Sequence, residues 1–154
     1  MIAPTNQGPF IRAALLCERV LCETDGTLSA IRILHEGVVS VPGNATPSLV
    51  LLLMLVRGEV SPGQHRMSLE ILDPSGEIMS HKQIVLTLDD GGPEQASSLM
   101  LDVSFTPRVP GVYWFRVSWD EEGARLLTRV PFTARAGAYS EGDDRTREGA
   151  HASR

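Results

Sequence analysis

Apolar and polar residues alternate with a period of two along much of this 154-residue chain. The clearest stretches are HRMSLEIL at 65–72, SSLMLDVSF at 97–105 and VYWFRVSW at 112–119. Alternation of this kind is typical of β-strands with one buried and one wet face. The pattern continues over 124–134, where Pro131 lacks an N–H and predicts a sheet edge or a bulge. In 77–88 it is regular only from Ile84 onward, which predicts an irregularity near 80–83.

Turn signals separate these strands at short intervals. The Asp-Gly step at 25–26 is a strong hairpin signal, because glycine accepts a positive φ. Pro-Gly pairs at 42–43, 62–63 and 110–111 suit type II turns, and DPSG at 73–76 suits a type I turn. About eight strands without an intervening helix predict an all-β fold. We expect a single antiparallel β-sandwich, immunoglobulin-like or C2-like, over 11–135, with a flexible segment at 1–10 and a disordered tail at 136–154.

The stretch ALLCERVLCETDGTLSAIRI, residues 14–33, admits a helix or a hairpin. Leu16 and Val20 are four apart, as on a helix face, but an Asp-Gly turn follows and every later element is a strand. Consistency along the chain favours a hairpin with a bend near Glu18 and Arg19. In one strand, Cys17 and Cys22 would point to opposite faces about 16 Å apart, too far for a disulfide. Their spacing matches no zinc site, so we expect buried free thiols in a reducing compartment.

Composition and charge narrow the function classes. The net charge is −5 with no basic stripe, which argues against a nucleic-acid partner. Aromatic residues make up only 5% of the chain, which argues against a function that depends on stacking aromatic side chains on bases or sugars. The longest apolar run, residues 49–56, is far shorter than the ~20 residues of a membrane-spanning helix. The first residues lack the pattern of a secretory signal. We expect a cytoplasmic protein without membrane insertion.

No motif for catalysis or cofactor binding is present. The chain has no GxSxG, phosphate loop, GxGxxG or SxxK. Its histidines show no HxH or HExxH spacing, and we expect them at the surface or at sheet edges: His35, His65, His81 and His151. His65 and His81 flank the DPSG turn and could approach each other across that hairpin. The sequence therefore predicts no catalytic residue, no cofactor and no enzyme.

Acidic residues gather in alternate loops. If consecutive strands run antiparallel, four loops share one end of the sandwich: those with Glu23 and Asp25, with residues 61–64, with Asp89, Asp90 and Glu94, and with 120–122. Carboxylates converging there could bind Ca²⁺, and the candidate ligands are Asp89, Asp90, Asp120, Glu121 and Glu122. The alternative is that turns are simply rich in acidic residues.

The run LVLLLMLV at 49–56 is apolar on both faces of its expected strand. Both faces need cover, from the core on one side and, on the other, from the N-terminal segment, the 36–48 loop or another chain. The leading function hypothesis is therefore a non-catalytic binding module with an unknown protein partner, or a homo-oligomer that self-associates through 49–56. The alternative is a small ligand- or cation-binding sandwich that uses the acidic loop end.

Three blocks carry a family resemblance: ALLCERVLCETDGTLSAIRI, LVLLLMLVRGEVSPGQHRMSLEILDPSGE and PGVYWFRVSWD. Together they resemble an uncharacterised bacterial family of small all-β proteins, a domain of unknown function, over roughly residues 13–134. The resemblance implies a β-sandwich and a strand at 13–17. It implies no activity and no catalytic residue. Cys17 matches the family's cysteine position, whereas Cys22 is particular to this chain.

Overall fold

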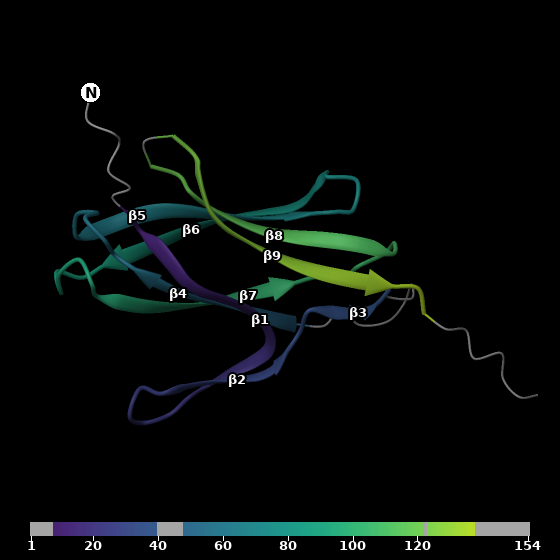
Figure 1. Cartoon of the computed structure of the whole chain (residues 1–154), viewed down its shortest axis with the longest axis horizontal. Coiled ribbons are helices and arrows are strands. Elements are labelled where there is room, and N and C mark those ends of the chain that lie inside the picture. Colours follow the sequence, from purple (N-terminus) through teal and green to yellow (C-terminus); the bar gives the residue numbers. More distant parts are fainter. Residues whose placement is uncertain (1–7, 40–47, 122, 138–154) are drawn as a thin grey trace, which may run out of the picture.

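The computed structural model describes residues 8–39, 48–121 and 123–137. The described residues form nine strands (Figure 1). Their bounds are β1 (Phe10–Cys22), β2 (Leu28–Ile33), β3 (Glu36–Val38), β4 (Ser48–Val56), β5 (Gly63–Leu72), β6 (Ile78–Leu88), β7 (Ala96–Ser104), β8 (Gly111–Trp119) and β9 (Arg125–Arg135). The described residues contain no helix that is long and apolar enough to cross a membrane.

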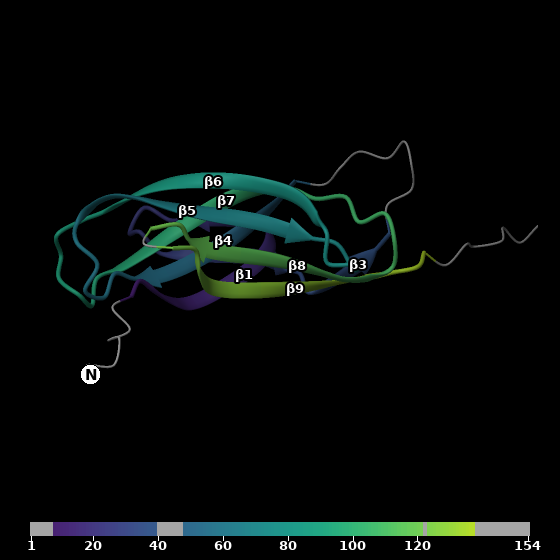
Figure 2. The ribbon, with the colours of Figure 1, turned by 90° about the horizontal axis from the view of Figure 1, so that it is seen from above.

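Two sheets pack face to face (Figure 2). One has the strand order β2-β1-β4-β7 and the other β3-β9-β8-β5-β6. All pairs are antiparallel except β3 with β9, which is parallel. The predicted β-sandwich is confirmed, but the expectation of about eight strands missed β3. Three residues are too few to show an alternating pattern.

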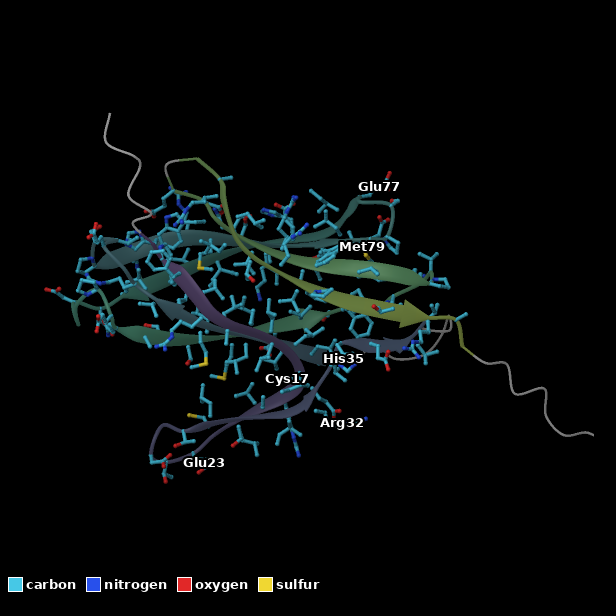
Figure 3. The ribbon with its side chains drawn as sticks, in the orientation of Figure 1. Cys17, Glu23, Arg32, His35, Glu77 and Met79 are labelled. Carbon is cyan, nitrogen blue, oxygen red and sulfur yellow. The ribbon has the colours of Figure 1, made fainter. Side chains whose placement is uncertain are left out.

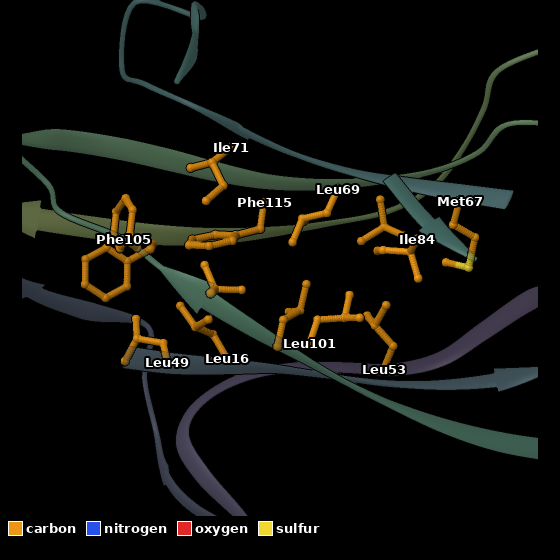
Figure 4. Close-up of a cluster of buried hydrophobic side chains, with 14 of the residues drawn as sticks. Leu16, Leu49, Leu53, Met67, Leu69, Ile71, Ile84, Leu101, Phe105 and Phe115 are labelled. Atoms are coloured by element: carbon orange, nitrogen blue, oxygen red, sulfur yellow. The ribbon is translucent and has the colours of Figure 1, made fainter. Parts of the chain in front are cut away.

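The space between the sheets holds the hydrophobic core. Every second residue of β4 faces inward, from Leu49 to Leu55, and all four are buried. Phe105 lies at the centre of an aromatic group and meets Tyr113, Phe115 and Phe132 edge-on, at centroid distances of 5.1, 5.2 and 5.1 Å. Edge-on contacts of this kind add stability beyond the area they bury. Figure 4 shows this layer of side chains between the sheets.

Strand order and one hydrogen-bonded corner identify the fold as immunoglobulin-like. Strands β1, β4 and β7 occupy the places of strands A, B and E, and β5, β8 and β9 those of C, F and G, with β6 beside C. Tyr113 lies near the start of β8, and its hydroxyl donates to the Val109 carbonyl at 2.8 Å and accepts from the Val109 N–H at 3.1 Å. A tyrosine bonded in this way is a hallmark of the immunoglobulin fold. Of the two predicted alternatives, the immunoglobulin-like one is confirmed.

Residues 14–33 form a hairpin, as predicted. The Asp-Gly turn closes with hydrogen bonds between Glu23 and both Gly26 and Thr27, and Gly26 has a φ of 84°. The predicted bend is also present: β1 turns back on itself, and Arg32, which lies opposite Glu18, has a positive φ of 54° (Figure 1). The Arg32 guanidinium and the Glu18 carboxylate are 3.2 Å apart across the bend.

Two smaller predictions can also be compared with the strands. Ile71 pairs with Ser80 and Leu72 with Ile78, so Met79 is an extra residue, a bulge one position before the predicted irregularity. Pro131 lies on a part of β9 that β3 does not reach, which fits the expected edge position. The first strand begins at Phe10, after a buried Gly8 and Pro9, and β9 ends at Arg135. Residues 1–7 and 138–154 lie outside the described residues, so the expected disorder there stays a prediction.

Removing the Tyr113 hydroxyl should destabilise the fold. Tyr113→Phe keeps the ring but deprives both Val109 backbone groups of their partner, so we expect a loss of about 1–2 kcal/mol in the free energy of unfolding. Urea titration followed by tryptophan fluorescence measures it. Thr87→Val removes an exposed hydroxyl on β6 and should change the value by less than about 0.5 kcal/mol. Equal effects of the two substitutions would contradict the structural role of this corner.

Candidate interaction surface

The outer face of the β2-β1-β4-β7 sheet is unusually apolar. Because Leu49, Leu51, Leu53 and Leu55 face the core, the intervening β4 residues point away from it. Leu52 is nevertheless only 4% exposed, and its neighbour on the same face, Cys17, is fully buried. Neither belongs to the core cluster between the sheets. A second, smaller buried layer therefore lies on this outer face.

The β1–β2 hairpin covers part of that layer. After Cys17, β1 bends away from the sheet, and Figures 1 and 2 together show the hairpin running back across the outer side of β4 and β7. Figure 3 places Cys17 at the bend and Glu23 at the far end of the hairpin. The expected cover was the N-terminal segment, the 36–48 loop or another chain. The described cover is the hairpin, and residues 40–47 lie outside the described residues.

Two methionines remain exposed beside the covered leucine. Leu52 lies between Leu15 and Met100 in the sheet, and the next outward residue of β4, Met54, lies beside Ser98 of β7. Met54 is 38% exposed and Met100 is 50% exposed. We call Leu52, Met54 and Met100 the methionine face. Flexible, polarisable methionine side chains adapt to different partners, so such a surface suits protein binding.

The two cysteines have different surroundings. Cys17 is buried, its thiol is 3.5 Å from the Val50 carbonyl oxygen, and burial raises the pKa of that thiol. A raised pKa keeps the thiol protonated and unreactive. Cys22 is exposed near the hairpin turn. The expectation of buried free thiols is confirmed for Cys17 and wrong for Cys22.

The predicted acidic end is divided by the bend in β1. The hairpin carries Glu23 away from the other three loops (Figure 3). The 89–95 loop is held to the end of β4 by Arg57, whose Nε donates to the Gly92 carbonyl at 3.2 Å and whose guanidinium is 3.9 Å from the Asp90 carboxylate. Among the described residues, no three His, Cys, Asp or Glu side chains are grouped so that they could hold a metal ion. Glu122 lies outside the described residues, so the cation hypothesis stays a prediction.

Several loop carboxylates bond within their own turns. Asp25 accepts the Thr27 N–H at 2.9 Å, and that bond lowers the pKa of Asp25. In the DPSG turn, the Asp73 carboxylate accepts hydrogen bonds from the hydroxyl and the N–H of Ser75. The bond from the hydroxyl is the main reason that the pKa of Asp73 is lowered. Aspartate is common in turns for this reason. These two residues support the alternative that acidic residues in the loops stabilise turns.

A buried histidine joins two loops at the end of the sandwich where β5 begins. His65 Nδ1 is 2.6 Å from the Glu121 carboxylate and Nε2 is 2.7 Å from the Ser61 carbonyl oxygen. Each ring nitrogen therefore lies within hydrogen-bonding distance of an oxygen, one on each of the two loops. The ring also packs on Trp119, with 5.1 Å between centroids. The expectation of surface or edge histidines is thus wrong for His65.

The remaining site predictions concern His81 and Asp120. His81 lies opposite Glu70 and His65 opposite Leu86, so the hairpin does not pair the two histidines with each other. Asp120 accepts a hydrogen bond from the Ser68 hydroxyl at 3.0 Å. Asp89 is exposed just after β6. The described candidate ligands therefore do not share one site: Asp90 lies near Arg57, Asp120 bonds to Ser68, Glu121 bonds to His65, and Asp89 is exposed.

No family model matches the chain, and no curated protein matches it. Among solved structures it is similar to an immunoglobulin-like protein from Pseudomonas aeruginosa, at 20% identity over 85% of this chain and 100% of that chain, with a TM-score of 0.46. It is also similar to the CARDB domain of a Pyrococcus furiosus protein in complex with di-metal ions, at 14% identity over 82% and 90% of the two chains, with a TM-score of 0.39. A glycosyl hydrolase family 2 member from Bacteroides cellulosilyticus matches at 16% identity over 70% of this chain and 16% of that chain, with a TM-score of 0.42. The resemblance seen in the sequence blocks stays a prediction.

Acid should remove the contribution of Glu121 to stability. The hydrogen bond from His65 lowers the pKa of Glu121 below its ordinary value of 4.5. A carboxyl group whose pKa is lower in the folded than in the unfolded chain stabilises the fold at pH values above its unfolded pKa. This stabilisation is lost as the pH falls through the folded pKa. We therefore expect E121Q to be less stable than the parent chain at neutral pH, with the difference shrinking below pH 4.5. Urea titrations at several pH values measure it, with E94Q in an exposed loop position as the control. A difference that is independent of pH would refute the role of this pair.

Cover by the hairpin should make Leu52 costly to truncate. Leu52→Ala removes a buried side chain outside the main core, and we expect a loss of about 2–5 kcal/mol in the free energy of unfolding. Met54→Ala, two residues along the same face, should cost less than about 1 kcal/mol because that side chain is exposed. Chemical unfolding measures both. Losses of similar size would mean that the hairpin does not pack on Leu52.

Proposed function

We propose that this chain is a non-catalytic interaction module that binds a protein partner through the methionine face. The observation that carries the proposal is the exposure of Met54 and Met100 around a buried Leu52. A monomeric protein usually buries such a group or breaks it with charges. Here the hairpin covers only part of the apolar outer face, which leaves Met54 and Met100 exposed to a partner.

The outer face of the second sheet is more polar and supports this choice of surface. There Arg116 and Glu70 form an ion pair at 2.8 Å, and the Arg129 guanidinium lies 4.8 Å from the Trp114 ring centroid. The exposed apolar side chains of that sheet are spread over four strands, at Val38 on β3, Ile78, Met79 and Val85 on β6, Val112 on β8 and Leu126 on β9. Charged groups thus lie in the middle of this second face, whereas Leu52, Met54 and Met100 are themselves apolar and have Asp102 at their margin.

A cytoplasmic location is part of the proposal. Both cysteines are free, and Cys22 carries an exposed thiol. Disulfides are rare in reducing compartments, and exposed free thiols persist there. The buried polar groups support a non-catalytic role, because His65, Glu121, Ser68 and Asp120 bond to one another or to the backbone at loop junctions.

A charge placed on the methionine face should abolish binding. M54E introduces a carboxylate within the methionine face, and V85E introduces a carboxylate at an exposed position of the other sheet. The parent chain, V85E and M54E are each immobilised and exposed to a bacterial extract. We then identify by mass spectrometry, and purify, the proteins that the parent chain and V85E capture but M54E does not. Titration calorimetry with the purified partner should then give a Kd at least about tenfold weaker for M54E, whereas V85E should match the parent.

The fold of each variant is checked first by its urea midpoint. Capture that M54E and V85E reduce equally, or that neither reduces, would exclude the methionine face as the binding surface.

A further inference from the structure

Strand β7 ends its sheet with an open edge. In the strand order β2-β1-β4-β7, its only neighbour among the described residues is β4. The other outer strands have features that oppose pairing with another chain: β2 bends at Arg32, β3 has three residues, and β6 has the Met79 bulge near its start and Lys82. Bulges, charges and short strands are the usual protection of sheet edges. Strand β7 has nine residues, pairs with β4 without a register shift, and carries one charge, Asp102.

The register with β4 identifies the free backbone groups of this edge. Arg57 N–H donates to the Gln95 carbonyl, so residues 95 and 57 form a hydrogen-bonded pair of the ladder. Bonded and non-bonded pairs alternate in an antiparallel ladder. The odd residues of β7 therefore bond to β4, and the N–H and C=O groups of the even residues point to the open edge. The even residues are Ala96, Ser98, Met100, Asp102 and Ser104.

We propose that this edge pairs antiparallel with β7 of a second copy of the chain, about a two-fold axis at Met100. This inference rests on the proposed function, in which the sheet that contains β4 and β7 is the binding surface. It adds that the partner is a second copy of the chain. Met100 is the middle residue of β7, so an axis there lets all five edge-facing residues pair. The two four-stranded sheets then form one continuous sheet, and the two methionine faces meet side by side.

The side chains fit this register. Asp102 lies opposite Ser98 of the second copy, where the hydroxyl can donate to the carboxylate, and Met100 lies opposite its own counterpart. Moving the axis to Asp102 would place the two carboxylates opposite each other, which is unfavourable, and would leave part of each edge unpaired. Leu99 and Leu101 face each other across the axis on the core side, which continues the apolar layer.

Opposite charge changes at Ser98 test the pairing. Ser98 is exposed on the face beside Met54, so neither change should disturb the monomer. S98D places two like-charge pairs across the axis and should weaken the dimer Kd by about tenfold, whereas S98K should strengthen it by a similar factor. Sedimentation velocity over a concentration series measures the approach to twice the chain mass of 16.7 kDa. T87D, which adds the same charge on exposed β6, should leave the Kd unchanged.

Residue-resolved amide exchange gives a second readout. At concentrations where the dimer forms, the N–H groups of Ser98, Met100 and Asp102 should become protected, whereas those of Leu99 and Leu101 should be protected at every concentration. A strict monomer, protection of the edge that does not depend on concentration, or equal effects of S98D and S98K would overturn the pairing. If the chain is monomeric but M54E still abolishes capture of another protein, only the pairing fails. If M54E has no effect while S98D and S98K shift the Kd in opposite directions, the pairing stands without the methionine face.

Discussion

Strand β4 needs apolar cover on both faces, and much of the architecture follows from this constraint. Its inward leucines enter the core between the sheets, and Leu52 on the outward side is almost as deeply buried. A strand of this composition in the middle of an ordinary two-layer sandwich would leave one face in water. The cost of exposing a leucine is on the order of 2 kcal/mol, so the chain gains by supplying a third layer.

The bend in β1 supplies that layer from the neighbouring strand. Leu16 faces the core and Cys17 the opposite side, so one short stretch packs on both layers. Beyond Cys17 the chain turns across the outer face, with Arg32 in a left-handed conformation opposite Glu18. The turn between β1 and β2 thus lies beyond the outer face of the sheet, on the same side of the molecule as the other three acidic loops but apart from them (Figure 1). An argument that only counts strands does not predict this separation.

Local patterns predicted the strands well, because a buried face imposes alternation on the residues that form it. The Asp-Gly hairpin, the bend and the position of Pro131 could all be read from a few neighbouring residues. Strand β3 could not, because its parallel pairing with β9 depends on residues far along the chain. His65 had a local signal that was missed: it continues the inward phase of Met67, Leu69 and Ile71. Its partners Glu121 and Ser61 come from two loops, and only the pairing of β5 with β8 brings those loops together.

Several polar side chains at this end of the sandwich bond to neighbouring loops. Arg57 fixes the 89–95 loop, and His65 joins the Ser61 and Glu121 loops. In the described ranges, no buried side-chain nitrogen or oxygen lacks a hydrogen-bond partner. A catalytic or ligand site normally keeps polar groups free for its substrate, because groups already paired must break those bonds first. The sheet that contains β4 offers exposed apolar side chains at Met54 and Met100 and the backbone edge groups of β7. In the proposed function, this sheet recognises its partner by shape, apolar contact and strand pairing, which are means by which one protein chain binds another.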